Sequence, residues 1–184
     1  MTTILILGFV ALSLSVVLFR AVSLKPAASP APAAPLSEVV SGLVAVDADG
    51  AAARLSALIR KRTVSSRDPG GWEPGEFEAF RALLPELYPE SHRVMELAIV
   101  AGHSMLYRWK GAEAGEPLVL MSHYDVVPAG DEGWERPPFS GDIHDGKVWG
   151  RGSIDTKCTL VCAFEAVETL IKSGHAPRRD VYLS

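Results

Sequence analysis

The sequence has little cysteine, and this scarcity excludes two classes of protein. Its 184 residues include only Cys158 and Cys162, too few for the disulfide framework of a small secreted domain. A thiolate zinc site needs further ligands, and no third cysteine is present. Because both cysteines fall in one helix-like apolar stretch, we predict that they are buried core thiols on one helix face.

An excess of positive charge is also lacking. Lys and Arg total 18 against 22 Asp and Glu, giving a net charge of -4, and the basic residues are spread along the chain. Nucleic acid is therefore not an expected partner. The chain has no Gly-x-Ser-x-Gly motif either, which argues against an α/β serine hydrolase.

One long apolar run stands at the N-terminus. Thr2 to Phe19 is uncharged and spans 18 residues, which reaches the lower limit of about 17–25 residues for a membrane-spanning helix. We assign residues 1–24 to a transmembrane anchor or, alternatively, to a cleaved signal segment. The protein is therefore expected to be membrane-anchored or secreted. Arg20 and Lys25 follow the run, but two charges do not decide the side of the membrane.

Residues 25–50 are predicted to be a Pro/Ala-rich linker. Their first part, KPAASPAPAAPLS, contains four prolines, and proline removes the amide donors that a helix needs. Such a stretch favours an extended spacer. Residues 51–184 are then the predicted globular domain.

Helical and strand patterns alternate along this domain. Apolar residues at helical spacing predict helices over Ala52–Arg62, over Glu76–Tyr88 with a kink or end at Pro85, and over Thr156–Ser173. Short apolar runs predict strands; they are His92–Ile99, His103–Lys110, Glu116–Met121, Lys147–Trp149 and Asp180–Leu183. The alternation favours an α/β sheet.

Two of the predicted strands carry a further expectation. Glu116–Met121 is short and apolar, which is typical of a strand buried on both faces. Asp180–Leu183 is apolar and stands last in the sequence, where a strand would leave an unprotected sheet edge. We therefore expect the chain to be the N-terminal part of a longer protein.

Two stretches place chemically reactive side chains where strands end or helices begin. In SHYD, His123 and Asp125 are two residues apart, so in extended chain they point to the same side. They fit either a metal site or a histidine satisfied by a local carboxylate. In GRGSIDTK, Asp155 precedes a predicted helix and is either its N-cap or a ligand. Lys157 in the first turn opposes the helix dipole, so we expect a partner for it, such as a carboxylate.

Together, SHYDVVP, GWERPPFSGDIHDGKVWGRGSIDTK and the helix that follows resemble the zinc metallopeptidase family of carboxypeptidases, aminoacylases, acetylornithine deacetylases and succinyl-diaminopimelate desuccinylases. The likeness is greatest to its Gly-Xaa carboxypeptidase and N-fatty-acyl-amino-acid hydrolase branch. It implies the N-terminal part of a di-zinc exopeptidase catalytic domain, a mixed sheet with flanking helices, here preceded by an apolar N-terminal helix.

The resemblance also implies roles for single residues. His123 matches the ligand of one zinc ion, Asp125 the acidic residue that orients the catalytic centre, and Asp155 the carboxylate that bridges two zinc ions. The expected reaction is hydrolysis of an amide bond by a zinc-activated water, in a small peptide or an N-acyl amino acid. The family also tends to hold the peptide bond after the bridging aspartate, here Asp155–Thr156, in the cis form.

The family pattern is incomplete in this sequence. It calls for a Glu-Glu pair, a further acid and a late histidine, all beyond the matched motifs, and the 184 residues contain none of them in that place. We therefore expect this polypeptide to be inactive alone. The alternative is a membrane-tethered, non-catalytic binding module derived from the same fold.

Overall fold

The computed structural model describes residues 15–16, 19–20, 45–68, 71–130 and 132–184. The predicted anchor or signal, residues 1–24, and the predicted linker, residues 25–50, lie largely outside these ranges. Within the described ranges, no helix is long and apolar enough to cross a bilayer. The elements that follow belong to the compact unit Val44–Ser184.

A four-stranded mixed sheet forms one layer of this unit, in the order β1-β2-β6-β3. Its strands are β1 (Glu96–Val100), β2 (Ser104–Trp109), β3 (Leu118–Leu120) and β6 (Val181–Leu183). The β1/β2 and β2/β6 pairs are antiparallel, whereas β3 runs parallel to β6. A separate two-stranded ribbon pairs β4 (Ile143–His144) with β5 (Lys147–Val148).

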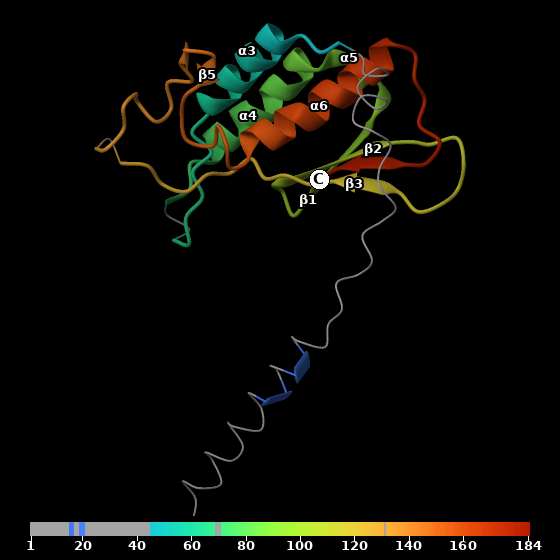
Figure 1. Ribbon diagram of the computed structural model, residues 1–184, viewed down its shortest axis with the longest axis horizontal. Coiled ribbons are helices and arrows are strands. Elements are labelled where there is room, and N and C mark those ends of the chain that lie inside the picture. Colours follow the sequence, from blue (N-terminus) through green and yellow to red (C-terminus); the bar gives the residue numbers. More distant parts are fainter. Residues whose placement is uncertain (1–14, 17–18, 21–44, 69–70, 131) are drawn as a thin grey trace, which may run out of the picture. The chain divides into compact units, whose positions relative to one another are not determined.

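Four helices form the second layer: α3 (Ala48–Ile59), α4 (Pro74–Leu87), α5 (Pro89–Val94) and α6 (Lys157–Lys172). Figure 1 shows all four on the same side of the sheet. Alternate residues of β2, namely Met105, Tyr107 and Trp109, are buried in the core cluster with residues of the helices. The prediction of an α/β fold with a mixed sheet and flanking helices is confirmed.

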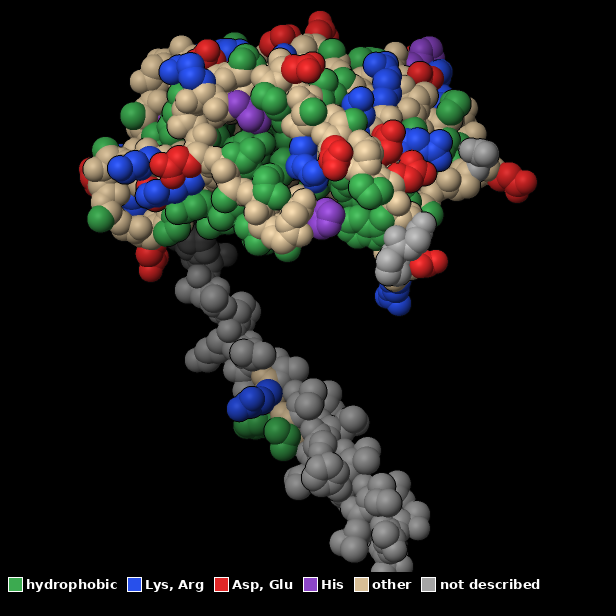
Figure 2. Space-filling view, turned by 180° about the vertical axis from the view of Figure 1, so that it is seen from behind, with side chains coloured by type: hydrophobic (Ala, Val, Ile, Leu, Met, Phe, Trp, Pro, Cys, Tyr) green, Lys and Arg blue, Asp and Glu red, His purple; other side chains and the backbone are tan. Residues whose placement is uncertain are grey.

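Helix α6 follows its predicted bounds closely, and its apolar stripe is buried. The same helix also buries two carboxylates, Glu165 and Glu168, which the apolar pattern did not indicate. The prediction that both cysteines are buried is wrong, because Cys162 is exposed and Cys158 is only partly covered. On the face seen in Figure 2, acidic and basic side chains are interspersed with hydrophobic ones.

The sheet corrects two expectations about its strands. The predicted last strand, β6, is not at an edge, since it pairs with β2 on one side and β3 on the other. The strand predicted to be buried on both faces, β3, is an edge strand, with Leu118 56% and Val119 48% exposed. Strand order depends on pairing between distant segments, so a local apolar pattern does not determine it.

Three helix bounds also differ from prediction. Helix α3 begins at Ala48, because the Asp47 side chain accepts a hydrogen bond from Gly50 and caps it. Pro85 lies inside α4 without ending it. Residues 92–94 are helical rather than extended, because the Glu168 carboxylate accepts main-chain hydrogen bonds at the start of α5.

Candidate functional site

The three residues singled out from the sequence come together in space. His123 and Asp125 follow β3, and Asp155 lies in the turn before α6. The His123 ring contacts both carboxylates, with 3.2 Å from Nδ1 to Asp125 Oδ1 and 3.1 Å from Nε2 to Asp155 Oδ1. Two segments 32 residues apart therefore form one cluster of imidazole and carboxylates.

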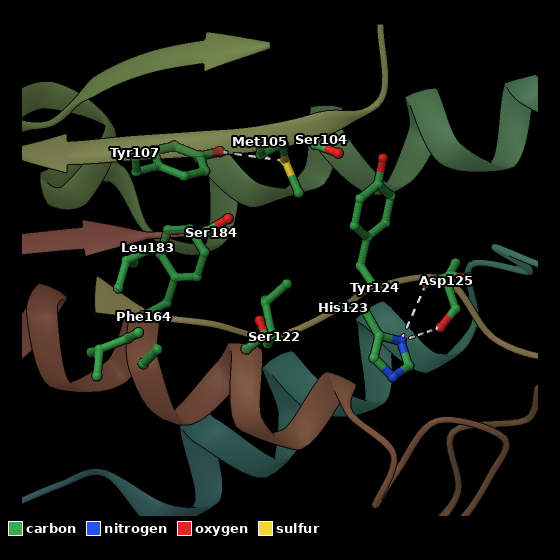
Figure 3. Close-up of a pocket in the computed structure, with 13 residues that line it drawn as sticks. Ser104, Met105, Tyr107, Ser122, His123, Tyr124, Asp125, Phe164, Leu183 and Ser184 are labelled. Atoms are coloured by element: carbon green, nitrogen blue, oxygen red, sulfur yellow. Dashed lines mark hydrogen bonds and ion pairs between the residues drawn. The ribbon is translucent and has the colours of Figure 1, made fainter. Parts of the chain in front are cut away.

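The contacts of the imidazole ring define its orientation. Nδ1 also lies 2.9 Å from the main-chain carbonyl of Asp125. The Asp125 carbonyl beside Nδ1 and the Asp155 carboxylate beside Nε2 can only accept, so the doubly protonated ring satisfies both contacts. When the ring is neutral, its proton is kept on Nδ1, which faces two oxygens of Asp125, and Nε2 is left free to bind a metal. Figure 3 shows the His123 ring beside Asp125, with both contacts dashed. A histidine that ligates a metal through Nε2 needs this tautomer.

Hydrogen bonds and neighbouring charges together outweigh the effect of burial on the pKa of His123. Partial burial of the ring acts to lower its pKa. Hydrogen bonds to the Asp125 carbonyl and the Asp155 carboxylate, together with both negative charges, act more strongly, so the pKa of His123 is raised above its ordinary value. A bound metal ion would compete with this proton.

The segment after helix α3 holds Asp125 in place. The Thr63 hydroxyl donates to the Tyr124 carbonyl, and the Val126 N–H donates to the Thr63 carbonyl at 2.8 Å. The Ser65 N–H in turn donates to the Val126 carbonyl at 2.9 Å. These bonds anchor the main chain on both sides of Asp125.

The turn that carries Asp155 contains two glycines whose Cα atoms lie close to neighbouring residues. A Cβ atom on Gly150, where φ is +146°, would lie 2.5 Å from the Ile59 side chain. A Cβ atom on Gly152, where φ is +88°, would lie 2.8 Å from the Val126 side chain. Both positions therefore require glycine. The Asp155–Thr156 peptide bond is cis, as the resemblance implied.

Lys157 has a different partner from the expected carboxylate. Its side chain is fully buried, and Nζ donates to the carbonyls of Leu58 at 3.0 Å and Lys61 at 2.8 Å, at the C-terminal end of α3. Leu58 lies in the last turn of α3, where the carbonyls carry the negative end of the helix dipole, and Lys61 follows the helix. Burial lowers the pKa of Lys157 to about 7, although the charges of Glu76 and Asp125 act to raise it.

A hollow of about 180 Å³ opens beside the cluster. His123, Tyr124 and Asp125 line it together with mainly apolar side chains, and Figure 3 shows them around the same space. The apolar part of the lining comprises Met105, Tyr107, Leu120, Leu160, Ala163, Phe164 and Leu183. The polar cluster thus borders an apolar surface.

Two atoms of the cluster, His123 Nε2 and Asp155 Oδ1, are of donor types that zinc binds. Two ligand atoms about 2.0–2.2 Å from a tetrahedral zinc ion lie roughly 3.4 Å apart, close to the 3.1 Å between His123 Nε2 and Asp155 Oδ1. The number of donors is smaller than a complete site needs. No group of three or more His, Cys, Asp or Glu side chains in the described part of the chain has metal-binding geometry, whereas catalytic zinc takes three protein ligands.

The other histidines lie in other surroundings. His92 bonds to the Tyr88 carbonyl and the Tyr107 hydroxyl, and the ring of His103 packs against Trp72. His144 forms an exposed pair with Asp145, with 3.3 Å between Nε2 and Oδ2. The sequence did not single out Thr156, which bonds to the main chain of His123, because no local pattern reveals a contact between residues 33 positions apart.

Residues 119–184 match the family model described as "Peptidase family M20/M25/M40". The chain is 38% identical over 138 residues to a probable carboxypeptidase S-like protein of Dictyostelium discoideum, covering 72% of this chain and 26% of that protein. It is 34% identical over 142 residues to carboxypeptidase S of Saccharomyces cerevisiae, covering 72% and 24%. It is 41% identical over 87 residues to an N-fatty-acyl-amino acid synthase/hydrolase of Homo sapiens, covering 47% and 17%.

Two solved structures share the fold. One is a metallo-carboxypeptidase from Sulfolobus solfataricus, with a TM-score of 0.57 and 24% identity, covering 72% of this chain and 29% of that chain. The other is human carnosine dipeptidase 1, with a TM-score of 0.57 and 21% identity, covering 83% and 34%. The chain spans about a quarter of the length of the first two curated relatives above.

Proposed function

Because residues 119–184 match the model of peptidase family M20/M25/M40, we propose that this chain supplies part of the active site of a metal-dependent amide hydrolase. The observation that carries the proposal is the convergence of His123, Asp125 and Asp155 at 3.1 and 3.2 Å. Neither carboxylate is adjacent to His123 in sequence, and the two reach opposite nitrogens of its ring. This arrangement leaves one nitrogen for a metal and orients the other.

Each of the three residues is assigned a separate role. His123 and Asp155 would hold zinc, and Asp155 has two carboxylate oxygens with which to contact two ions. Asp125 holds the Nδ1 proton of His123, which keeps Nε2 basic and fixes the plane of the ring. Zinc bound there would lower the pKa of a water molecule and polarise the carbonyl of an amide.

For the substrate, we propose a small peptide or an N-acyl amino acid. The support is the chain's similarity to carboxypeptidases and to an N-fatty-acyl-amino acid synthase/hydrolase. We also propose that residues 1–24 anchor the protein in a membrane or direct its secretion, with residues 25–50 as a spacer. The support there is the apolar run and the prolines. Extraction of expressed protein from membranes with alkaline carbonate, with N-terminal mass analysis, tests this assignment.

One experiment tests metal binding and turnover together. The 184-residue chain is dialysed to equilibrium against zinc, and both bound metal and hydrolysis of an N-acyl amino acid are measured. We expect zinc to bind at least about tenfold more weakly to the Asp155→Asn variant. The matched control is Asp145→Asn, because Asp145 also contacts an exposed histidine but lies outside the cluster.

Turnover is expected to equal that of a metal-only control. Two side-chain ligands are fewer than catalytic zinc takes, and in the described residues no hydrogen bond or ion pair joins a glutamate base to His123, Asp125 or Asp155. Zinc affinity that is the same in wild type and Asp155→Asn would favour the non-catalytic binding module. Hydrolysis well above the control would contradict the expected inactivity of the chain alone.

A further inference from the structure

The side chain of Thr156 bonds to both main-chain polar groups of His123. Its Oγ1 accepts a hydrogen bond from the His123 N–H at 3.1 Å and donates one to the His123 carbonyl oxygen at 3.0 Å. A single hydroxyl thus uses its donor and one acceptor site on a residue 33 positions earlier. This doubly bonded contact joins the two segments of the candidate site.

The position of Thr156 makes this use of its hydroxyl unusual. Thr156 is the N-cap residue of α6, where a threonine side chain ordinarily accepts from an amide of the first helical turn. Here the side chain makes no capping hydrogen bond. The hydroxyl is directed to the distant segment instead of to its own helix.

The main chain of His123 depends on this contact. After strand β3 ends at Leu120, the Ser122 N–H still donates to the Ser184 carbonyl, and the next main-chain hydrogen bond along the chain joins Val126 to Thr63. Between these points, no main-chain group of the described residues bonds to the N–H or the carbonyl of His123. Thr156 therefore provides the partner for both groups.

We infer that Thr156 is a positioning residue, which clamps the main chain of His123 to the start of α6. Asp155 directly precedes Thr156, so the clamp also sets the 3.1 Å separation between His123 Nε2 and Asp155 Oδ1. The inference rests on the proposed function, because the separation matters for catalysis only when the two side chains share a metal ion. A small displacement of either segment would change the distance between the two ligand atoms.

Both hydrogen bonds of the clamp are made by the Thr156 hydroxyl. Thr156→Val keeps the shape of the side chain but leaves the N–H and carbonyl of His123 without this partner. Thr156→Ser keeps the hydroxyl and removes only a methyl group. Thr159→Val is the matched control, because Thr159 is an exposed threonine in the first turn of the same helix.

Amide hydrogen exchange of the full chain tests the clamp itself. We expect the His123 amide to exchange about tenfold faster in Thr156→Val, and to stay within about threefold of wild type in Thr156→Ser and Thr159→Val. An unchanged exchange rate in Thr156→Val would overturn the inference. Should Thr156→Val unfold, Thr156→Ala takes its place, because it also lacks the hydroxyl. Exchange of the His123 amide about tenfold faster in Thr156→Ala than in Thr156→Ser would support the clamp, and equal rates would overturn it.

Zinc titration of the same variants tests the consequence. With the His123 imidazole resonances as the readout, Thr156→Val is expected to weaken zinc binding about tenfold, and Thr156→Ser is expected to restore it. If wild type binds no zinc at His123, the proposed function fails, whatever the exchange data show. If wild type binds zinc there and Thr156→Val binds it equally well, the positioning role fails while the proposed function stands.

Discussion

Replacing Arg54 with leucine is expected to destabilise the protein by about 3–5 kcal/mol. The Glu165 side chain is only 8% exposed, and its carboxylate accepts hydrogen bonds from Nε and Nη2 of Arg54 and from the Tyr88 hydroxyl. Removing Arg54 leaves a buried negative charge with one neutral donor. Burial and the Glu165 charge also raise the pKa of Tyr88, so its hydroxyl stays protonated and continues to donate. A neutral hydroxyl does not replace the positive charge of Arg54.

Urea unfolding followed by tryptophan fluorescence measures this loss. The control is Arg93→Leu, which removes an exposed pair with Glu90 and should cost less than about 1 kcal/mol. The double variant Arg54→Leu/Glu165→Leu should recover part of the loss, because it removes the stranded charge as well. An Arg54→Leu variant within about 1 kcal/mol of wild type would show that this pair does not hold α3 against α6.

The buried ammonium group of Lys157 is expected to make stability rise with pH. Its pKa is lowered to about 7 by burial in the folded protein, whereas a lysine in the unfolded chain has a pKa near 10.4. Between these values the unfolded chain binds more protons than the folded one. The free energy of unfolding therefore increases as pH rises through this window, and the gain is lost as pH falls toward 7.

The Lys157→Met variant isolates this effect, because it removes the titrating group. From about pH 7 to about pH 9.5, the free energy of unfolding of wild type should increase by about 3 kcal/mol relative to the variant. Urea unfolding of both proteins at each pH provides the comparison. Parallel pH profiles would mean that Lys157 stays protonated in the folded state, held by the Leu58 and Lys61 carbonyls.

The spacing of apolar residues predicted the elements that depend only on neighbouring residues in the sequence. Helix α6 could be predicted because its apolar residues repeat with the helical period over four turns. The place of β6 in the middle of the sheet could not, because it depends on pairing with β2 and with β3, and β2 lies more than 70 residues earlier. The burial of Glu165 was missed for the same reason, since its partner Arg54 is 111 residues away.

In the candidate site, too, the residues could be selected from the sequence but their distant partners could not. His123, Asp125 and Asp155 could be selected from two short motifs, and the structure brings both carboxylates within 3.2 Å of the His123 ring. The motifs do not reveal which distant groups each of their residues contacts. Thr156 and Lys157 belong to the second motif, but Thr156 bonds to the main chain of His123 and Lys157 bonds at the end of α3.

The central claim is that His123 and Asp155 form a metal site, with Asp125 orienting the imidazole. A zinc titration of the 184-residue chain, followed through the nitrogen resonances of its histidines, tests it most directly. His144 is an internal control, because it also lies beside an exposed carboxylate, with 3.3 Å between His144 Nε2 and Asp145 Oδ2. Since a proton competes with the metal, the titration is run at about pH 8.

The expected result is a saturable shift of His123 Nε2 at zinc concentrations at least about tenfold below those that affect His144. Asp155→Asn should abolish that preference, and Asp125→Asn should weaken binding at His123 by about 10–100-fold. The claim is contradicted if His144 responds as readily as His123, or if Asp155→Asn leaves the His123 titration unchanged.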